Sequence, residues 1–358
     1  MGRTAYPGGR LELTTLVPGS YPLALNENPY GPLPSVRRAL ERALASANRY
    51  PEFLPDRLPR LIAARIGCSP EQIVVGPGAT GVILYILQAF AAPGGARVIM
   101  ADPTFDGYPL LTATVGGNPV PVPLTAAGAQ DLDAMAAAVD ERTGVVVLCD
   151  PHNPTGTRLH PRELTGFLDR IGSRVNVILD EAYIEFVTPE RRIDTLALLA
   201  AYPNVIVVRT FSKAFGLAGL RVGYAVAAPG IAARIAHWQV PFGMNILAEV
   251  GVQACYAAED ELNQRIHAIV DERDRLSTAL RRGGYILPDS SANYIFVPLN
   301  DPALTRRISD AFTGAGIQVK QYSTGMRVTV GDPVANEAVV RVAREVVGDF
   351  VPAIGQIA

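Results

Sequence analysis

A single lysine stands between two hydroxyl side chains and an arginine, directly after an apolar run. Lys213 follows Thr210 and Ser212, and Arg221 lies eight residues further along the chain. Burial and a nearby cation both disfavour the ammonium form, so the amine of Lys213 could attack a carbonyl. The hydroxyls and Arg221 could then hold a phosphate on the same guest. The pattern favours condensation with a phosphorylated aldehyde, although a lone Ser-Lys pair is also typical of a surface lysine beside a salt bridge.

The composition limits the classes of protein that need to be considered. The chain has 358 residues, of which 49% are hydrophobic and 18% charged, enough for a large core and two domains. The formal net charge is -2 and no short segment gathers lysine and arginine, so nothing indicates a nucleic-acid partner. We expect a globular protein that acts on small molecules.

Cysteine usage and the N-terminal segment bear on metal binding and location. Cys68, Cys149 and Cys255 are widely spaced without a C-x-x-C pair, which is typical of thiols in a reducing compartment. Cys149 and His152 are close in sequence, but four scattered histidines supply no second ligand pair, so no metal is expected. Residues 1–19 hold no apolar run long enough for a signal peptide, and no membrane partner is expected. The predicted location is cytoplasmic.

Short β-branched apolar runs alternate with helix-length segments in the first two thirds of the chain. The runs are 73–75, 97–100, 144–148, 176–179 and 205–208. Continuous hydrophobicity predicts parallel strands covered on both faces by helices. Each run ends in polar residues or glycine, and ligands of an open α/β sheet bind at the carboxyl ends of its strands. The polar residues are therefore expected to converge on one site.

After about residue 240 the pattern changes to long helices and short strands. The expected helices and strands are 244–256, 258–282, 293–297, 317–320, 326–330 and 333–347. This order predicts a smaller α+β domain. We expect three parts: an N-terminal segment over 1–44, a large domain over 45–243 and a small domain over 244–358.

The stretch 76–81 matches the G-x-G-x-x-G pattern after a strand, and Asp102 lies about twenty residues on. By itself this would indicate an NAD-dependent dehydrogenase. That interpretation leaves Lys213 and Asp180 without a role, and glycines before a helix bind phosphate whichever molecule carries it. The dehydrogenase stays a remote alternative.

Three further motifs carry a resemblance to a known family. Asn153-Pro154-Thr155-Gly156, Asp180-Glu181-Ala182-Tyr183, and Ser212-Lys213 with Arg221 resemble, in order and spacing, the signature of fold-type I pyridoxal-phosphate aminotransferases of class I and II. Segments 25–31, 49–51 and 326–331 are similar to the histidinol-phosphate and aromatic aminotransferase branch. The resemblance extends from about residue 23 to about residue 347. It implies a large domain that binds pyridoxal 5'-phosphate through a mostly parallel sheet flanked by helices.

The resemblance implies roles for the central residues. Lys213 would form the aldimine with the cofactor and later move the proton between the substrate and the cofactor. Asp180 would keep the pyridine nitrogen protonated, which makes the ring an electron sink. Tyr183 and Asn153 would hydrogen-bond the phenolic oxygen.

The remaining cofactor contacts follow from the same resemblance. The phosphate would be bound by Ala79, Thr80, Thr210, Ser212 and Arg221. Phe105 and Ala182 would lie against the two faces of the ring, with plain core packing as the less favoured alternative for Phe105. Tyr50 would reach the phosphate of the neighbouring subunit, which implies a homodimer with shared sites.

The substrate end of the site is expected to hold an arginine and a lysine. Arg327 would bind the α-carboxylate as a bidentate fork, and Asn26, in the segment that covers the site, is a weaker candidate. Lys320 stands where histidinol-phosphate enzymes usually have arginine, and the loop 321–325 is short. Both features favour an aromatic or related amino acid over histidinol phosphate. The expected reaction moves an amino group between this amino acid and a 2-oxo acid; decarboxylation, elimination or oxidation on the same fold is the alternative.

Overall fold

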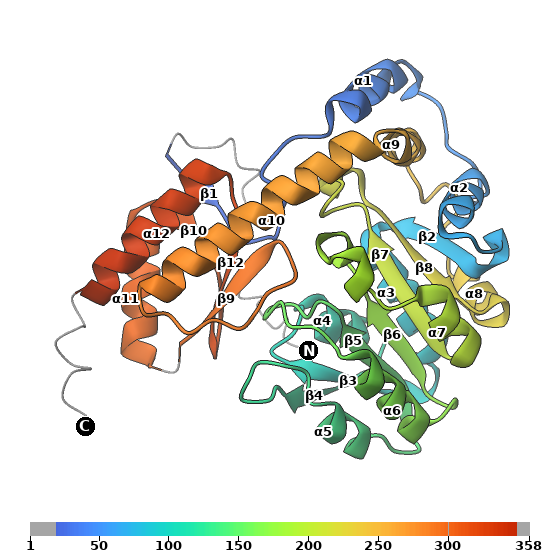
Figure 1. The fold of residues 1–358 in the computed structure, drawn as a ribbon. Coiled ribbons are helices and arrows are strands. Elements are labelled where there is room, and N and C mark those ends of the chain that lie inside the picture. Colours follow the sequence, from blue (N-terminus) through green and yellow to red (C-terminus); the bar gives the residue numbers. More distant parts are fainter. Residues whose placement is uncertain (1–18, 300, 349–358) are drawn as a thin grey trace, which may run out of the picture.

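The structure is a computed structural model that describes residues 19–299 and 301–348. The ends of the expected N-terminal segment and small domain, 1–18 and 349–358, lie outside the described residues. Figure 1 shows two lobes, each built around its own sheet, with α10 (Glu259–Arg282) running from one lobe to the other.

The larger lobe is built on a seven-stranded sheet of order β2-β8-β7-β6-β5-β3-β4. Its strands are β2 (Ile73–Pro77), β3 (Arg97–Asp102), β4 (Asn118–Pro123), β5 (Thr143–Cys149), β6 (Asn176–Asp180), β7 (Val205–Thr210) and β8 (Val222–Ala227). The strands from β4 to β7 are parallel, whereas β8 runs antiparallel to both β7 and β2. The parallel strands place their carboxyl ends along one edge.

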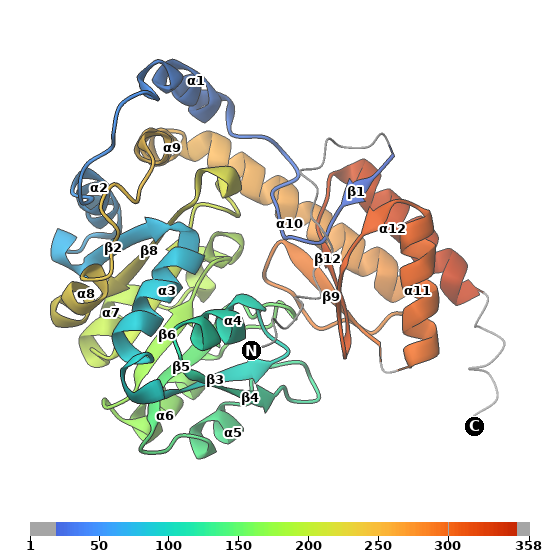
Figure 2. The same ribbon diagram turned by 180° about the vertical axis from the view of Figure 1, so that it is seen from behind.

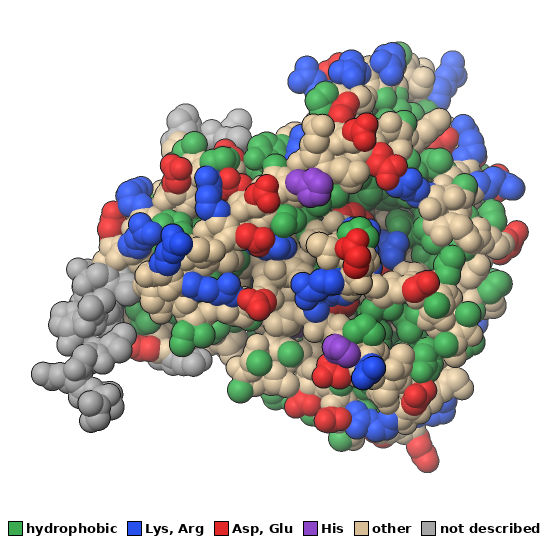
Figure 3. All heavy atoms as spheres, in the orientation of Figure 1, with side chains coloured by type: hydrophobic (Ala, Val, Ile, Leu, Met, Phe, Trp, Pro, Cys, Tyr) green, Lys and Arg blue, Asp and Glu red, His purple; other side chains and the backbone are tan. Residues whose placement is uncertain are grey.

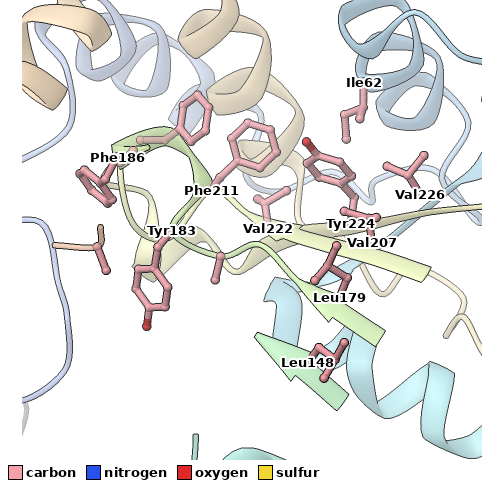
Figure 4. Packing of buried hydrophobic residues seen from close by; sticks show 14 of the residues in the cluster. Ile62, Leu148, Leu179, Tyr183, Phe186, Val207, Phe211, Val222, Tyr224 and Val226 are labelled. Carbon is pink, nitrogen blue, oxygen red and sulfur yellow. The ribbon is translucent and has the colours of Figure 1, made fainter. Parts of the chain in front are cut away.

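Helices cover both faces of this sheet, as the two opposite views show (Figures 1 and 2). One apolar cluster joins the sheet to α3 (Gly78–Phe90), α4 (Gly107–Thr114) and α8 (Pro229–Ala236). The other joins it to α2 (Arg57–Ile66), α5 (Leu132–Ala137), α6 (Pro161–Ile171), α7 (Thr195–Ala201) and α9 (Ile246–Ala257). Figure 4 shows part of the second cluster, in which the hydroxyl of Tyr183 points away from the packed aromatic rings. Burial of valine and isoleucine on both faces explains the uninterrupted apolar runs.

The smaller lobe has a three-stranded antiparallel sheet of order β11-β12-β9. Its elements are β9 (Tyr294–Pro298), β11 (Lys320–Tyr322), β12 (Gly325–Thr329), α11 (Pro302–Gly314) and α12 (Pro333–Gly348). The N-terminal segment joins this lobe because β1 (Tyr21–Pro22) pairs with β10 (Ile317–Gln318). The chain then crosses to the larger lobe, where α1 (Pro34–Ala43) packs against α9.

The predicted α/β class with a mostly parallel sheet is confirmed, and all five predicted strands of the large sheet are present. The expected strand 317–320 is instead divided between β10 and β11, which pair with different partners. The dinucleotide interpretation is wrong at the fold level. Its strand, β2, lies at the sheet edge and pairs only with antiparallel β8, whereas the fingerprint needs a parallel βαβ unit.

Candidate active site

A cavity of about 240 Å³ lies where the carboxyl ends of β5, β6 and β7 meet the start of α3. Its lining residues are Leu25, Glu27, Ala79, Thr80, Ile83, Phe105, Tyr108, Cys149, Asn153, Asp180, Ala182, Tyr183, Thr210, Ser212, Lys213, Ala218 and Arg221. They include every residue predicted to contact the cofactor except Tyr50. The convergence follows from the parallel sheet, which brings distant strand ends to one edge.

One end of the cavity has the chemistry of an anion site. Ala79 and Thr80 occupy the first turn of α3, whose backbone N–H groups have no partner within the helix. Gly78 has φ +76°, and a Cβ there would lie 2.3 Å from Nη2 of Arg221. A Cβ on Gly223 would lie 2.2 Å from the backbone nitrogen of Ala79. Glycine is therefore required at both positions for the helix start and Arg221 to approach this closely.

Hydroxyl groups complete this end of the cavity. The Thr210 hydroxyl donates to Oγ of Ser212 over 2.9 Å, and Nη1 of Arg221 lies 3.4 Å from the same oxygen. Arg221 has a left-handed backbone, φ 54°, which is uncommon outside glycine and often found at functional sites. Backbone N–H groups, hydroxyls and a guanidinium together suit a phosphate.

Lys213 lies beside this cradle, just after β7. Its Nζ donates to the backbone oxygens of Leu25 and Asn26, both over 3.0 Å. Burial lowers the pKa of Lys213 to about 7, and the positive charges of Arg327 and Arg221 act in the same direction. A substantial part of Lys213 is therefore neutral amine near neutral pH, the form that can attack a carbonyl or accept a proton.

Asp180 ends β6 and is buried at the cavity wall. Its Oδ1 accepts a hydrogen bond from the Ala182 backbone over 3.0 Å, and Oδ2 accepts one from the Tyr108 hydroxyl over 2.5 Å. Burial raises the pKa of Asp180, while both hydrogen bonds and Lys213 oppose this rise. A buried carboxylate held in this way is suited to a cationic or hydrogen-bonding ring nitrogen.

The Tyr183 hydroxyl lies opposite, fixed by two amides. It accepts hydrogen bonds from Nδ2 of Asn26 over 2.9 Å and from Nδ2 of Asn153 over 3.3 Å. Burial raises the pKa of Tyr183, so the phenol keeps its proton. Because both amides donate to its oxygen, the proton of Tyr183 can be donated into the cavity.

Arg327, on β12, reaches the same region from the small lobe. Its Nη1 donates to Oδ1 of Asn153 over 2.5 Å and to the Tyr322 hydroxyl over 3.2 Å, and Nη2 donates to the Ala24 oxygen over 2.5 Å. Its Nε is buried without a hydrogen-bond partner, and no carboxylate among residues 19–299 and 301–348 pairs with it. A buried guanidinium with neutral neighbours can accept an anionic ligand.

Four predicted residues are not among the residues that line the cavity. Asn26 and Arg327 bond lining residues, whereas Tyr50 and Lys320 make their contacts elsewhere. Tyr50 is 82% exposed, and its ring contacts that of Phe242, with centroids 4.8 Å apart. Lys320 forms an ion pair with Asp106 across the two lobes, with Nζ 2.5 Å from the carboxylate. Within the described part of the chain, no group of three or more histidine, cysteine, aspartate or glutamate residues could hold a metal ion, and no helix has the length and apolarity needed to span a bilayer.

Sequence reasoning missed Tyr108, Glu27 and Cys149, which all line the cavity. Tyr108 has a recognisable signal, because it lies three residues after Phe105 and both rings reach the same wall. Cys149 lies at the end of β5, and from the sequence it was considered only as a possible metal ligand.

Comparison with known proteins assigns the family. The model for aminotransferase class I and II matches residues 20–343. The chain belongs to this family. Aromatic amino acid aminotransferases from Streptomyces coelicolor and Cutibacterium acnes are 42% and 40% identical to it, covering 92% and 91% of this chain and 91% and 92% of theirs.

Solved structures agree with the fold of this aminotransferase. Histidinol-phosphate aminotransferase from Sinorhizobium meliloti, in complex with pyridoxal-5'-phosphate, superposes with a TM-score of 0.85 at 27% identity, covering 92% of this chain and 91% of that one. An L-threonine-O-3-phosphate decarboxylase from Porphyromonas gingivalis has a TM-score of 0.76 at 21% identity, covering 92% of this chain and 99% of that one, which shows the shared fold alone. This aminotransferase uses pyridoxal phosphate, and the glycine-lined cradle beside Lys213 fits that cofactor.

Proposed function

We propose that this aminotransferase takes an aromatic or related amino acid as donor and binds it between Arg327 and the cavity wall. The pairing of Lys320 with Asp106 carries the proposal: although this ion pair is partly exposed, it offsets part of the charge that would otherwise attract a phosphorylated side chain toward the site. Tyr322 packs edge-on against Phe296, with ring centroids 6.1 Å apart, and its hydroxyl contacts Arg327. The region next to Arg327 is thus aromatic, and the charges of Lys320 and Asp106 offset each other beside it. The relatives named aromatic amino acid aminotransferase support the same donor class.

Pyridoxal phosphate supplies a carbonyl for amine exchange and a ring that accepts electrons. We assign its covalent attachment to Lys213. Its phosphate is assigned to the cradle of Ala79, Thr80, Thr210, Ser212 and Arg221, and its ring to the space between Phe105 and Ala182.

Proton handling is assigned to three side chains. Lys213, with its lowered pKa, accepts the proton from the donor α-carbon and returns it. Asp180 would hold the ring nitrogen of the bound cofactor in its protonated form. Tyr183, oriented by Asn153 and Asn26, would donate to the phenolic oxygen. Asn26 thereby acts through Tyr183 as well as lying near the substrate.

The α-carboxylate of the donor is assigned to Arg327. Its guanidinium already bonds Asn153, Tyr322 and Ala24 through neutral oxygens, so an arriving carboxylate would meet an uncompensated charge. A planar fork binds a carboxylate through two parallel hydrogen bonds, whereas a lysine could not.

We further propose a homodimer in which Tyr50 of one protomer reaches the phosphate site of its partner. Tyr50 belongs to a cluster of aromatic side chains, in which the ring of Phe242 contacts the rings of both Tyr50 and Phe53. Phe53 and Phe242 are themselves exposed, and such patches mark protein interfaces. Elsewhere acidic and basic side chains are interspersed, as the visible face in Figure 3 shows. Light scattering should give a dimer; a fully active monomer would refute the shared site.

We also propose a division into a segment 1–44, a large domain 45–243 and a small domain 244–358, which places the two larger sheets in different domains. Helix α9 belongs to the proposed small domain by sequence, but it packs in the apolar cluster of the large lobe. A cytoplasmic location is also proposed. It is supported by three cysteines without any disulfide between them.

The donor proposal is tested by kcat/KM for phenylalanine, tyrosine and histidinol phosphate with one 2-oxo acid. We expect the aromatic donors to be preferred by about tenfold or more, equivalent to about 1.4 kcal/mol in transition-state binding. A tenfold preference for histidinol phosphate would overturn the proposal. The Asp106→Asn variant supplies the matched control, because freeing Lys320 should reduce the difference in kcat/KM between the aromatic donors and histidinol phosphate.

A further inference from the structure

Tyr108 connects two parts of the site that sequence motifs treat separately. It lies on α4, is 1% exposed, and lines the cavity. Its hydroxyl donates to Oδ2 of Asp180 over 2.5 Å. Its ring also meets that of Phe105 edge-on, with centroids 5.4 Å apart and planes at 88°. One side chain therefore contacts both the proposed stacking ring and the proposed partner of the ring nitrogen.

The surroundings of Asp180 make this hydroxyl important. The ionisable groups around its carboxylate are Tyr108 from α4, Cys149 from β5, Tyr183 after β6 and Lys213 after β7. The Cys149 thiol bonds the Pro151 oxygen, and the Tyr183 hydroxyl bonds two amides. Within the described residues, Tyr108 is the side chain that donates a hydrogen bond to Asp180.

Tyr108 remains a donor across the working pH range. Burial and then the charge of Asp180 raise the pKa of the phenol well above its usual value. A carboxylate that accepts a hydrogen bond from a neutral phenol has a lower proton affinity than one without it. In a buried site this difference decides which of two facing groups holds a shared proton.

We propose that Tyr108 is a positioning residue that keeps the shared proton on the cofactor nitrogen rather than on Asp180, while its ring supports Phe105. The inference rests on the proposed roles of Lys213 and Asp180. Without the hydroxyl, Asp180 would become the stronger base and would hold the shared proton itself. The electron-accepting chemistry that the cofactor supplies when bound would then be weaker, and the Lys213 nitrogen would keep its own proton to a higher pH.

The test compares Tyr108→Phe with the unmodified enzyme, each loaded with pyridoxal phosphate. Tyr202→Phe is the control because the Tyr202 hydroxyl also donates to a carboxylate, that of Asp169 over 2.8 Å, outside the site. Tyr108→Phe should raise the pH midpoint of the visible cofactor band by about half a unit or more. It should lower kcat by about tenfold, while the dissociation constant of the cofactor changes less than about threefold. Tyr202→Phe should change none of these values.

Two outcomes would overturn the inference. One is an unchanged pH midpoint with an unchanged kcat; the other is a lower melting temperature and weaker cofactor binding without a shift in the midpoint, which a structural role alone would produce. Borohydride reduction of the same unmodified sample distinguishes failure of the proposed function from failure of the role proposed for Tyr108. If no cofactor is attached to Lys213, the proposed site is wrong, whereas attachment to Lys213 with an unshifted Tyr108→Phe midpoint rejects only the role of Tyr108.

Discussion

Asp150 is predicted to contribute strongly to stability, although it does not line the cavity. It directly follows β5 and is fully buried. Its carboxylate accepts hydrogen bonds from Nε of Arg158 over 2.6 Å, from Nη2 of Arg158 over 2.9 Å, and from the Leu159 backbone over 2.9 Å. This ion pair closes the loop that carries Asn153.

The size of the effect follows from what Asp150→Asn removes. The substituted side chain can still accept from Leu159, but the charge of Arg158 loses its partner in a largely buried position. Breaking a buried pair by removing one partner costs about 3–5 kcal/mol. Arg158 also donates to the Arg191 oxygen over 3.0 Å, so we expect the lower end, about 3 kcal/mol. At about 2 °C per kcal/mol for a large chain, the melting temperature should fall by about 6 °C.

The assay is thermal unfolding of the cofactor-free protein, with Asp133→Asn as the matched control. Asp133 pairs with Arg170 over 2.8 Å, but its side chain is 90% exposed, so its loss should cost less than about 1 kcal/mol. Equal shifts in the two variants would refute the reasoning. A second check is Asp150→Asn combined with Arg158→Met, which should recover part of the loss because no unpaired charge remains.

Three further outcomes are expected at the site. Arg327→Lys should raise KM for every amino donor by about tenfold because the bidentate contact is lost; an unchanged KM in steady-state assays would count against it. Asp180→Asn should slow single turnovers by about a hundredfold or more with an unchanged melting temperature, and a near-normal rate would remove Asp180 from the mechanism. Attachment of cofactor to the cofactor-free protein should accelerate as pH rises through about 7, because Lys213 is protonated and unreactive below its lowered pKa; a midpoint near 10 would contradict that pKa.

The central sheet could be predicted because burial on both faces leaves a direct mark on the sequence. Runs such as 144–148 and 205–208 are uninterrupted since no side of the strand meets water. The convergence of Asn153, Asp180 and Lys213 followed from the parallel order alone. The roles proposed for them came from the motifs that resemble the family.

Two strands of the large sheet and one contact between the lobes could not be predicted from the sequence. The strand β4 contains Pro119, Pro121 and Pro123, and prolines normally argue against a strand because they cannot donate a hydrogen bond to a neighbour. The prolines are tolerated here because β4 lies at the edge of the sheet. The strand β8 begins directly after Arg221, so its residues were interpreted as part of the site motif and its antiparallel pairing with β7 was not predicted. The pairing of Lys320 with Asp106 depends on how two lobes meet, which local sequence does not encode.

The most direct test of the account uses the rarity of lysine in this chain, which has only Lys213 and Lys320. The enzyme loaded with pyridoxal phosphate would be reduced with borohydride, digested and mapped by mass spectrometry. We expect the cofactor to be attached to the peptide containing Lys213, with Lys320 and the terminal amine unmodified. Attachment at Lys320, or no stable attachment at either lysine, would contradict it.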